Sequence, residues 1–137
     1  MGAGMSAIFG LVPYLVIQGS VIAVAGAAGV WLFYVQHQFE DAYWERSDDW
    51  GYADAALRGS SFYALPKVLQ WFSGNIGFHH VHHLNATIPF YRLPEAMAGI
   101  PELQHPGVTT WSPRDIVAAL KLKLWDPEKH EMVGYPH

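Results

Sequence analysis

The sequence predicts an all-α fold: an integral membrane helical protein with a cytosolic helical cap. Two observations predict this class. Residues 1–39 contain no Asp, Glu, Lys or Arg, and every charged residue of the chain follows from Glu40 onward. Within that stretch, residues 8–35 are almost wholly apolar, which is longer than the roughly 20 residues that a helix needs to cross a bilayer. We therefore expect a membrane-spanning segment, 1–39, and a cytosolic or interfacial histidine-rich region with a C-terminal amphipathic helix, 40–137.

The membrane helix is expected from Pro13 to Val35, with residues 1–12 as the end of a preceding loop or helix. Ala25 and Gly29 are small residues four positions apart, which suits close packing against another helix. Aromatic rings favour the boundary between lipid and water, and three of them lie near the end of this segment: Trp31, Phe33 and Tyr34.

Two other interpretations of this apolar segment are weaker. A signal peptide has a basic region before a shorter apolar core, and no basic residue precedes this segment. A buried helix of a soluble domain is a second alternative, which the long uncharged stretch disfavours. Every Lys and Arg follows the helix, so the rule that positive loops stay in the cytoplasm places the C-terminal part there.

Composition excludes several function classes. The chain has no cysteine, so it has no disulfide, no thiolate metal site and no cysteine nucleophile. Its net charge of −4 and the absence of a basic run give no support to nucleic-acid binding.

Four segments are expected after the membrane helix. Residues 40–50 suit an interfacial helix and loop, and residues 61–84 suit a re-entrant or interfacial helix pair. Residues 85–107 hold four prolines and are expected to be an ordered loop. The tail from Glu128 is polar and is expected to be loose.

A short amphipathic helix is expected before that tail. Ser112 is placed to cap it, with Pro113 at the first helical position and Asp115 three residues after the cap. Apolar residues then repeat at four-residue spacing up to Leu124, and Asp126 before a proline ends the helix.

The sequence "GFHHVHH", residues 77–83, predicts a metal site. Residues three and four apart share a helix face, so His79, His82 and His83 are neighbours there, and His80 also lies near His83. Neutral imidazole binds Fe, Zn, Cu and Ni, whereas buried imidazoles without a metal would be left unpaired or would repel one another. The alternative is an exposed, solvated histidine run. His37 is a weak indication by itself, but it lies at the same predicted membrane boundary.

Other polar residues are expected to have ordinary roles. His105, His130 and His137 lie in loop or tail and are expected to be unrelated to the site. Arg92 and Glu95 could support bound imidazoles, but a surface ion pair is the simpler expectation.

Two segments carry a resemblance to a known family. "NIGFHHVHHLNATIPFYRLPEA" resembles the last histidine box, H-x-x-H-H, of the membrane fatty acid desaturases. "GVWLFYVQHQFEDAYWE" is similar to the segment before that box in the bacterial acyl-lipid branch, which includes Δ12/ω-6 type enzymes. The resemblance extends from about Pro13 to Trp125 and keeps the two segments in the family order.

The resemblance implies a site and a reaction. The family holds two irons through histidines at the cytosolic membrane surface, activates O₂ and leaves a cis double bond in an acyl chain. Electrons come from a ferredoxin or cytochrome-type donor, and a bacterial inner membrane is the implied location. By position, the implied metal ligands are His37, His79, His82 and His83. His80 occupies the variable position of the box, and Gln36, its neighbour Gln38 and Asn75 are candidates for orienting the ligands.

The chain departs from the family pattern in its short membrane part, with one clear span where the family has about four, and above all in its histidine boxes. The family has two earlier histidine boxes, H-x-x-x-H and H-x-x-H-H, and nothing like them precedes His37. We therefore expect a C-terminal fragment that is inactive alone and that needs an upstream half of the same enzyme. The alternatives are a related histidine-box membrane hydroxylase and a non-catalytic membrane metal-binding fragment.

Overall fold

A computed structural model describes residues 2–136 of the chain, and it forms two compact units, Met1–Phe33 and Tyr34–His137. The first unit holds helix α1 (Gly2–Phe9) and most of helix α2 (Leu11–His37). The division by packing falls inside α2. The expected division at residue 39 follows the charge pattern instead and stays a prediction.

Helix α2 extends two residues beyond the expected span at each end. Gly10 separates it from α1 with φ at +88°, a left-handed conformation that glycine adopts without a steric penalty. Among the described residues, α2 is the one helix long and apolar enough to cross a membrane. A Cβ on Gly29 would meet nothing within 4 Å, so its expected helix partner stays a prediction.

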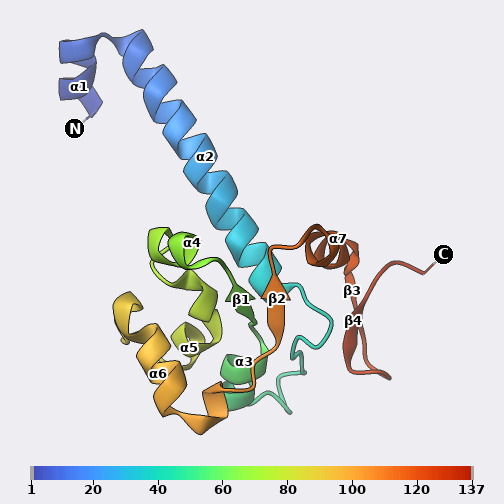
Figure 1. Cartoon of the computed structure of the whole chain (residues 1–137). Helices are drawn as coiled ribbons and strands as arrows, with labels where there is room; N and C mark the ends of the chain where they lie inside the picture. The colour runs from blue at the N-terminus through green and yellow to red at the C-terminus, as the bar shows by residue number, and fades with distance from the viewer. Residues whose placement is uncertain (1, 137) are drawn as a thin grey trace. The chain divides into compact units, whose positions relative to one another are not determined.

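The second unit, described from Tyr34 to residue 136, contains short helices and short strands (Figure 1). The elements in chain order are α3 (Tyr52–Arg58), β1 (Phe62–Ala64), α4 (Lys67–Phe72), η1 (Ile76–Phe78), α5 (His79–Leu84), η2 (Phe90–Arg92), α6 (Leu93–Gly99), η3 (Pro101–Leu103), β2 (Val108–Thr110), α7 (Pro113–Lys121), β3 (Leu124–Asp126) and β4 (Glu131–Val133).

The expectation of an all-α fold is therefore only partly correct, because the mainly helical chain also forms two small sheets. Strands β1 and β2 pair in parallel, with Tyr63 opposite Thr109, and β3 and β4 pair antiparallel. The Ser61 and Thr109 hydroxyls, 2.8 Å apart, join the first pair at a buried position. The β1–β2 pairing joins residues far apart in the chain, so it leaves little trace in a local pattern. Each strand of the two sheets has only three residues.

Several local expectations in this unit need correction. Residues 40–50 are irregular, and the helix begins only at Tyr52. The expected loop at 85–107 contains α6, whose Pro94 occupies the first turn, where its missing N–H costs nothing. The expected helix pair at 61–84 is present as α4 and α5, although the segment starts with β1.

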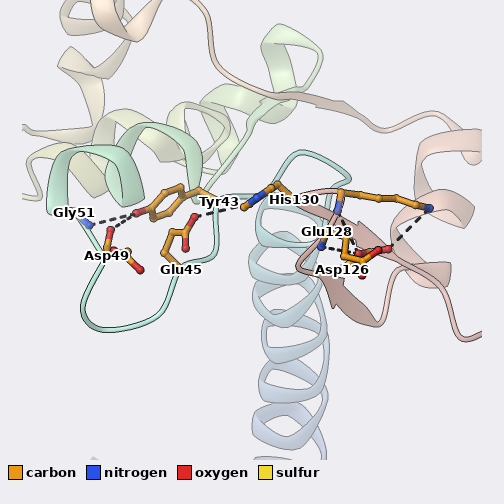
Figure 2. Close-up of polar contacts among 8 residues, drawn as sticks. Tyr43, Glu45, Asp49, Gly51, Asp126, Glu128 and His130 are labelled. Carbon is orange, nitrogen blue, oxygen red and sulfur yellow. Dashed lines mark hydrogen bonds and ion pairs between the residues drawn. The ribbon is translucent and has the colours of Figure 1, made fainter.

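The C-terminal segment is also more ordered than expected. The Ser112 hydroxyl accepts a hydrogen bond from the Asp115 N–H at 3.2 Å, which confirms the predicted cap of α7. The helix nevertheless ends at Lys121, because the Lys123 N–H donates to the Val133 carbonyl and draws the chain into a hairpin. Part of the expected loose tail therefore forms strand β4, and the Asp126 carboxylate accepts the Glu128 N–H in the turn before this strand (Figure 2).

A small apolar core supports the segment that carries the histidines. Val81, Leu93 and Leu103 are its buried centre, and they bring α5, α6 and η3 together. Since Val81 lies in the middle of the histidine run, this packing fixes which face of α5 is buried and which is left for the imidazoles.

Candidate metal centre

Helix α5 begins at His79, and the chain just before it is held tightly. The Gly77 N–H donates to the Gln70 Oε1 at 3.2 Å, and the Gln70 Nε2 donates to the Tyr63 carbonyl at 3.0 Å. A Cβ at Gly77 would overlap that same carbonyl oxygen, so only glycine fits there without a shift. Strand β1 and helix α4 thus set where the histidine run starts.

Three of the four predicted ligands come together. His37 lies at the end of α2, and its Nε2 is 3.2 Å from the Nε2 of His83, 46 positions later. The His83 Nε2 is in turn 3.1 Å from the Nε2 of His79, one helical turn away. One ring nitrogen from each of the three residues lies within 4.8 Å of the others.

The two distances to the His83 Nε2 fit a shared metal ion better than they fit hydrogen bonds. Two nitrogens bound to one ion at about 2.1 Å lie about 3.0 to 3.4 Å apart, for bond angles between octahedral and tetrahedral. A neutral imidazole Nε2 carries either one proton or one lone pair in the ring plane. The His83 Nε2 has two close nitrogen neighbours and can form a good hydrogen bond with only one of them. A metal ion would instead accept a lone pair from each neighbour, which removes this conflict.

The electrostatics of the group favour the neutral, metal-binding form. Burial, followed by the nearby His83 and His37, lowers the pKa of His79 to about 3. Burial, with His37 and His82, also lowers the pKa of His83. Because a metal needs the unprotonated nitrogen, these two ligands are ready to bind at neutral pH without first losing a proton.

His82 lies to one side of the three. Its ring stacks on that of His79, with the ring centres 5.9 Å apart, and its nitrogens are not part of the close group. It lines an open cavity of about 500 Å³ whose other walls are largely apolar, with Ile88 and Leu93 among them. His82 therefore lies on the same helix as His79 and His83, but its ring lines the cavity and is not part of their close group of nitrogens.

Comparison with known proteins identifies the family of the chain. The family model described as "Fatty acid desaturase" matches residues 1–114. The chain belongs to the fatty acid desaturase family. A Bacillus subtilis (strain 168) protein named "Fatty acid desaturase" is 44% identical over 135 residues, which is 98% of this chain and 38% of that protein. The chain thus spans well under half the length of this relative, and no solved structure matches it.

Gln36, next to His37, connects the end of α2 to the histidine segment. Its side-chain amide is fully buried and donates to the Ile76 carbonyl at 2.6 Å, while its backbone carbonyl accepts the Ser61 N–H at 2.9 Å. These bonds hold His37 close to the start of α5. Gln36 acts on the backbone rather than on an imidazole, so its expected role in orienting a ligand stays a proposal.

The other predicted supporting residues make hydrogen bonds that hold the fold around the histidine run. The buried His80 donates from Nε2 to the Leu103 carbonyl at 3.2 Å, and burial lowers its pKa although this bond opposes the effect. Asn75 adopts a left-handed conformation at φ 56° and donates from Nδ2 to the Phe90 carbonyl at 3.1 Å. The Gln38 Nε2 donates to the Leu122 carbonyl at 2.8 Å.

One supporting residue escaped the sequence analysis. The Tyr52 hydroxyl on α3 lies 3.1 Å from the His83 carbonyl and 2.9 Å from the Leu84 carbonyl. It satisfies carbonyls at the end of α5, which have no partner inside the helix. Nothing local in the sequence marks Tyr52 for this role, because the contact depends on α3 packing against α5.

The residues expected to be ordinary are placed accordingly. Arg92 and Glu95 form an exposed ion pair at 2.9 Å, as the simpler expectation had it. The His130 Nδ1 lies 3.9 Å from the Glu45 Oε1, which connects the loop after α2 to the C-terminal hairpin (Figure 2). His105 is exposed, and His137 lies outside the described residues.

Proposed function

We propose that the chain is the C-terminal part of a di-iron membrane fatty acid desaturase, which introduces a cis double bond into an acyl chain using O₂ and electrons. The observation that carries the proposal is the approach of His37 to His79 and His83 across more than forty residues. A run of histidines arises easily in one helix. A third imidazole brought from a distant helix end to metal-ligand distance supports a built site.

Each histidine has a proposed role. The neutral nitrogens of His37, His79 and His83 would hold one iron, and bound iron would supply the O₂ activation that removes hydrogen from an unactivated acyl C–H bond. His82 would bind the second iron, together with ligands that this chain does not contribute. Its place at the wall of an apolar cavity would put an acyl chain beside the metal centre.

The protein around the histidines keeps them ready for this role. Gln36 and Tyr52 fix the backbone at the two ends of the group, so that the three rings converge before a metal arrives. Bound through Nε2, His79 carries its proton on Nδ1, which is buried and has no acceptor among the described residues. We expect that acceptor to be a water molecule or a group from the rest of the enzyme.

The chain alone is proposed to be inactive. Three converging nitrogens and His82 make up part of a two-iron ligand set, and the family pattern places further histidine boxes upstream. The location proposed is a bacterial inner membrane with the histidines on the cytoplasmic side, since every Lys and Arg follows α2. There, a ferredoxin or cytochrome-type donor would supply electrons.

The test is a chimera. The part of the Bacillus subtilis desaturase that this chain matches is replaced by the chain, and the product is expressed in a host that forms no double bonds by desaturation. Gas chromatography with mass spectrometry of the host lipids is expected to show new cis-unsaturated acyl chains. Chimeras carrying His37→Ala or His83→Ala, at equal membrane abundance, are expected to show none, as is the chain expressed alone.

Each of the other results of the chimera experiment would contradict part of the proposal. Hydroxylated acyl chains from the chimera would identify a histidine-box hydroxylase instead. Unchanged double-bond formation in the His37→Ala chimera would contradict the ligand assignment. An inactive but folded and iron-loaded chimera would support a non-catalytic metal-binding fragment.

A further inference from the structure

The surface formed by α4 and η2 exposes large aromatic side chains. Trp71 and Phe72 end α4 with 74% and 75% of their surfaces exposed, and Phe90 and Tyr91 in η2 are 60% and 66% exposed. Water-soluble surfaces rarely gather side chains of this size in one place, so such a patch marks an interaction surface. We call these four residues the aromatic face.

The two pairs belong to one surface. The turn after α4 packs on η2, because a Cβ at Gly74 would lie 3.5 Å from the Phe90 ring, and the Asn75 side chain donates to the Phe90 carbonyl at 3.1 Å. Each pair is also arranged edge to face, with ring centres 4.9 Å apart for Trp71 and Phe72 and 5.5 Å apart for Phe90 and Tyr91. These contacts fix the rings in place instead of letting them fold back onto the unit.

The charged residues near the aromatic face indicate what kind of surface covers it. No acidic residue lies between Asp54 and Glu95, and the charges within that stretch are all positive. They include Lys67 at the start of α4, next to the aromatic face. The acidic residues that precede this stretch lie in α3 and the loop before it, and α3 and α4 lie at opposite ends of β1 (Figure 1).

We propose that the aromatic face inserts into the interfacial layer of an anionic lipid bilayer, as a membrane contact separate from α2. Trp and Tyr favour the boundary between headgroups and acyl chains, where the ring is in an apolar layer and its polar atom is hydrated. Lys67 would meet the lipid phosphates, and the acidic loop before α3 would be repelled from them. The surface would thereby hold the histidine segment at a fixed depth beside the lipid.

The test uses the absence of cysteine in the chain. Single-cysteine variants Phe72→Cys and Tyr91→Cys of the full chain are spin-labelled in vesicles that contain anionic lipid. Collision with oxygen, which concentrates in lipid, is compared with collision with a nickel chelate, which stays in water. Val24→Cys on α2 is the lipid control, and Trp111→Cys, on a side chain that is 57% exposed, is the water control.

We expect oxygen collisions to exceed nickel collisions at positions 72 and 91, with a ratio between that at Val24 in the middle of α2 and that at Trp111, and well above the latter. Nickel access equal to that at Trp111 would overturn the proposal, because the face would then be in water. Shielding from both reagents would overturn it as well, because a protein surface would then cover the face. If either spin label disturbs folding, a label at Val68→Cys, also on α4, tests the same prediction.

Discussion

Replacing His37 by alanine tests whether the tertiary structure, and not merely the histidine run, makes the metal site. The substitution removes one of three ring nitrogens. The His83 Nε2 lies 3.2 Å from the His37 Nε2 and 3.1 Å from the His79 Nε2. The side chain lies at the end of α2, and alanine continues a helix well, so the backbone should keep its course.

The magnitude follows from the energy that a ligand contributes. Structural four-ligand zinc sites bind with about 10 to 16 kcal/mol, or roughly 3 kcal/mol for each ligand. A loss of about 3 kcal/mol corresponds to about a hundredfold weaker binding. His37→Ala is therefore expected to weaken the binding of a divalent ion by about a hundredfold.

The assay is a titration of the full chain in detergent with Co²⁺, followed through its visible absorption. His82→Ala is the matched control, since His82 is on the same helix as two ligands but outside the close group. It is expected to change the affinity much less than His37→Ala does, and His105→Ala is expected to change nothing. Equal losses for His37→Ala and His82→Ala would refute the assignment of the first ion to His37, His79 and His83.

Three further predictions concern stability. Gln36→Leu leaves the partly buried Ile76 carbonyl without its donor and is expected to lower the free energy of unfolding by about 1 to 3 kcal/mol in chemical denaturation. Gly77→Ala forces a methyl group onto the Tyr63 carbonyl and is expected to cost about 1 to 3 kcal/mol, whereas Gly99→Ala, with open space around it, should not destabilise; thermal melts of both decide this. The pKa of His79 is about 3 in the folded chain and 6.5 when unperturbed, so the unfolded state binds the proton first. The free energy of unfolding should therefore fall as the pH drops from about 6.5 towards 3, and denaturation that is flat over this range would contradict it.

The sequence predicted the elements whose causes are local. The apolar run gave helix α2 to within two residues at each end, because length and hydropathy are enough for a helix of this kind. The cap of α7 was also found, since Ser112 and Asp115 are three residues apart and act on one another's backbone. The end of α7 was missed because Lys123 is recruited by Val133, a partner that the helical pattern does not contain.

In the metal centre, too, local causes could be found from the sequence and tertiary causes could not. The sequence by itself determined that His79 and His83 share a face of one helix, because the helical repeat puts residues four apart side by side. It could suggest His37 only weakly from its place at the predicted membrane boundary, and more firmly through resemblance. The tertiary structure alone decided that His37 meets them, that His82 does not join the same group, and that Tyr52 supports the end of α5. The physical reason is that these relations depend on packing and hydrogen bonds between segments far apart in the chain, such as the bond from Gln36 to Ile76, which no local spacing specifies.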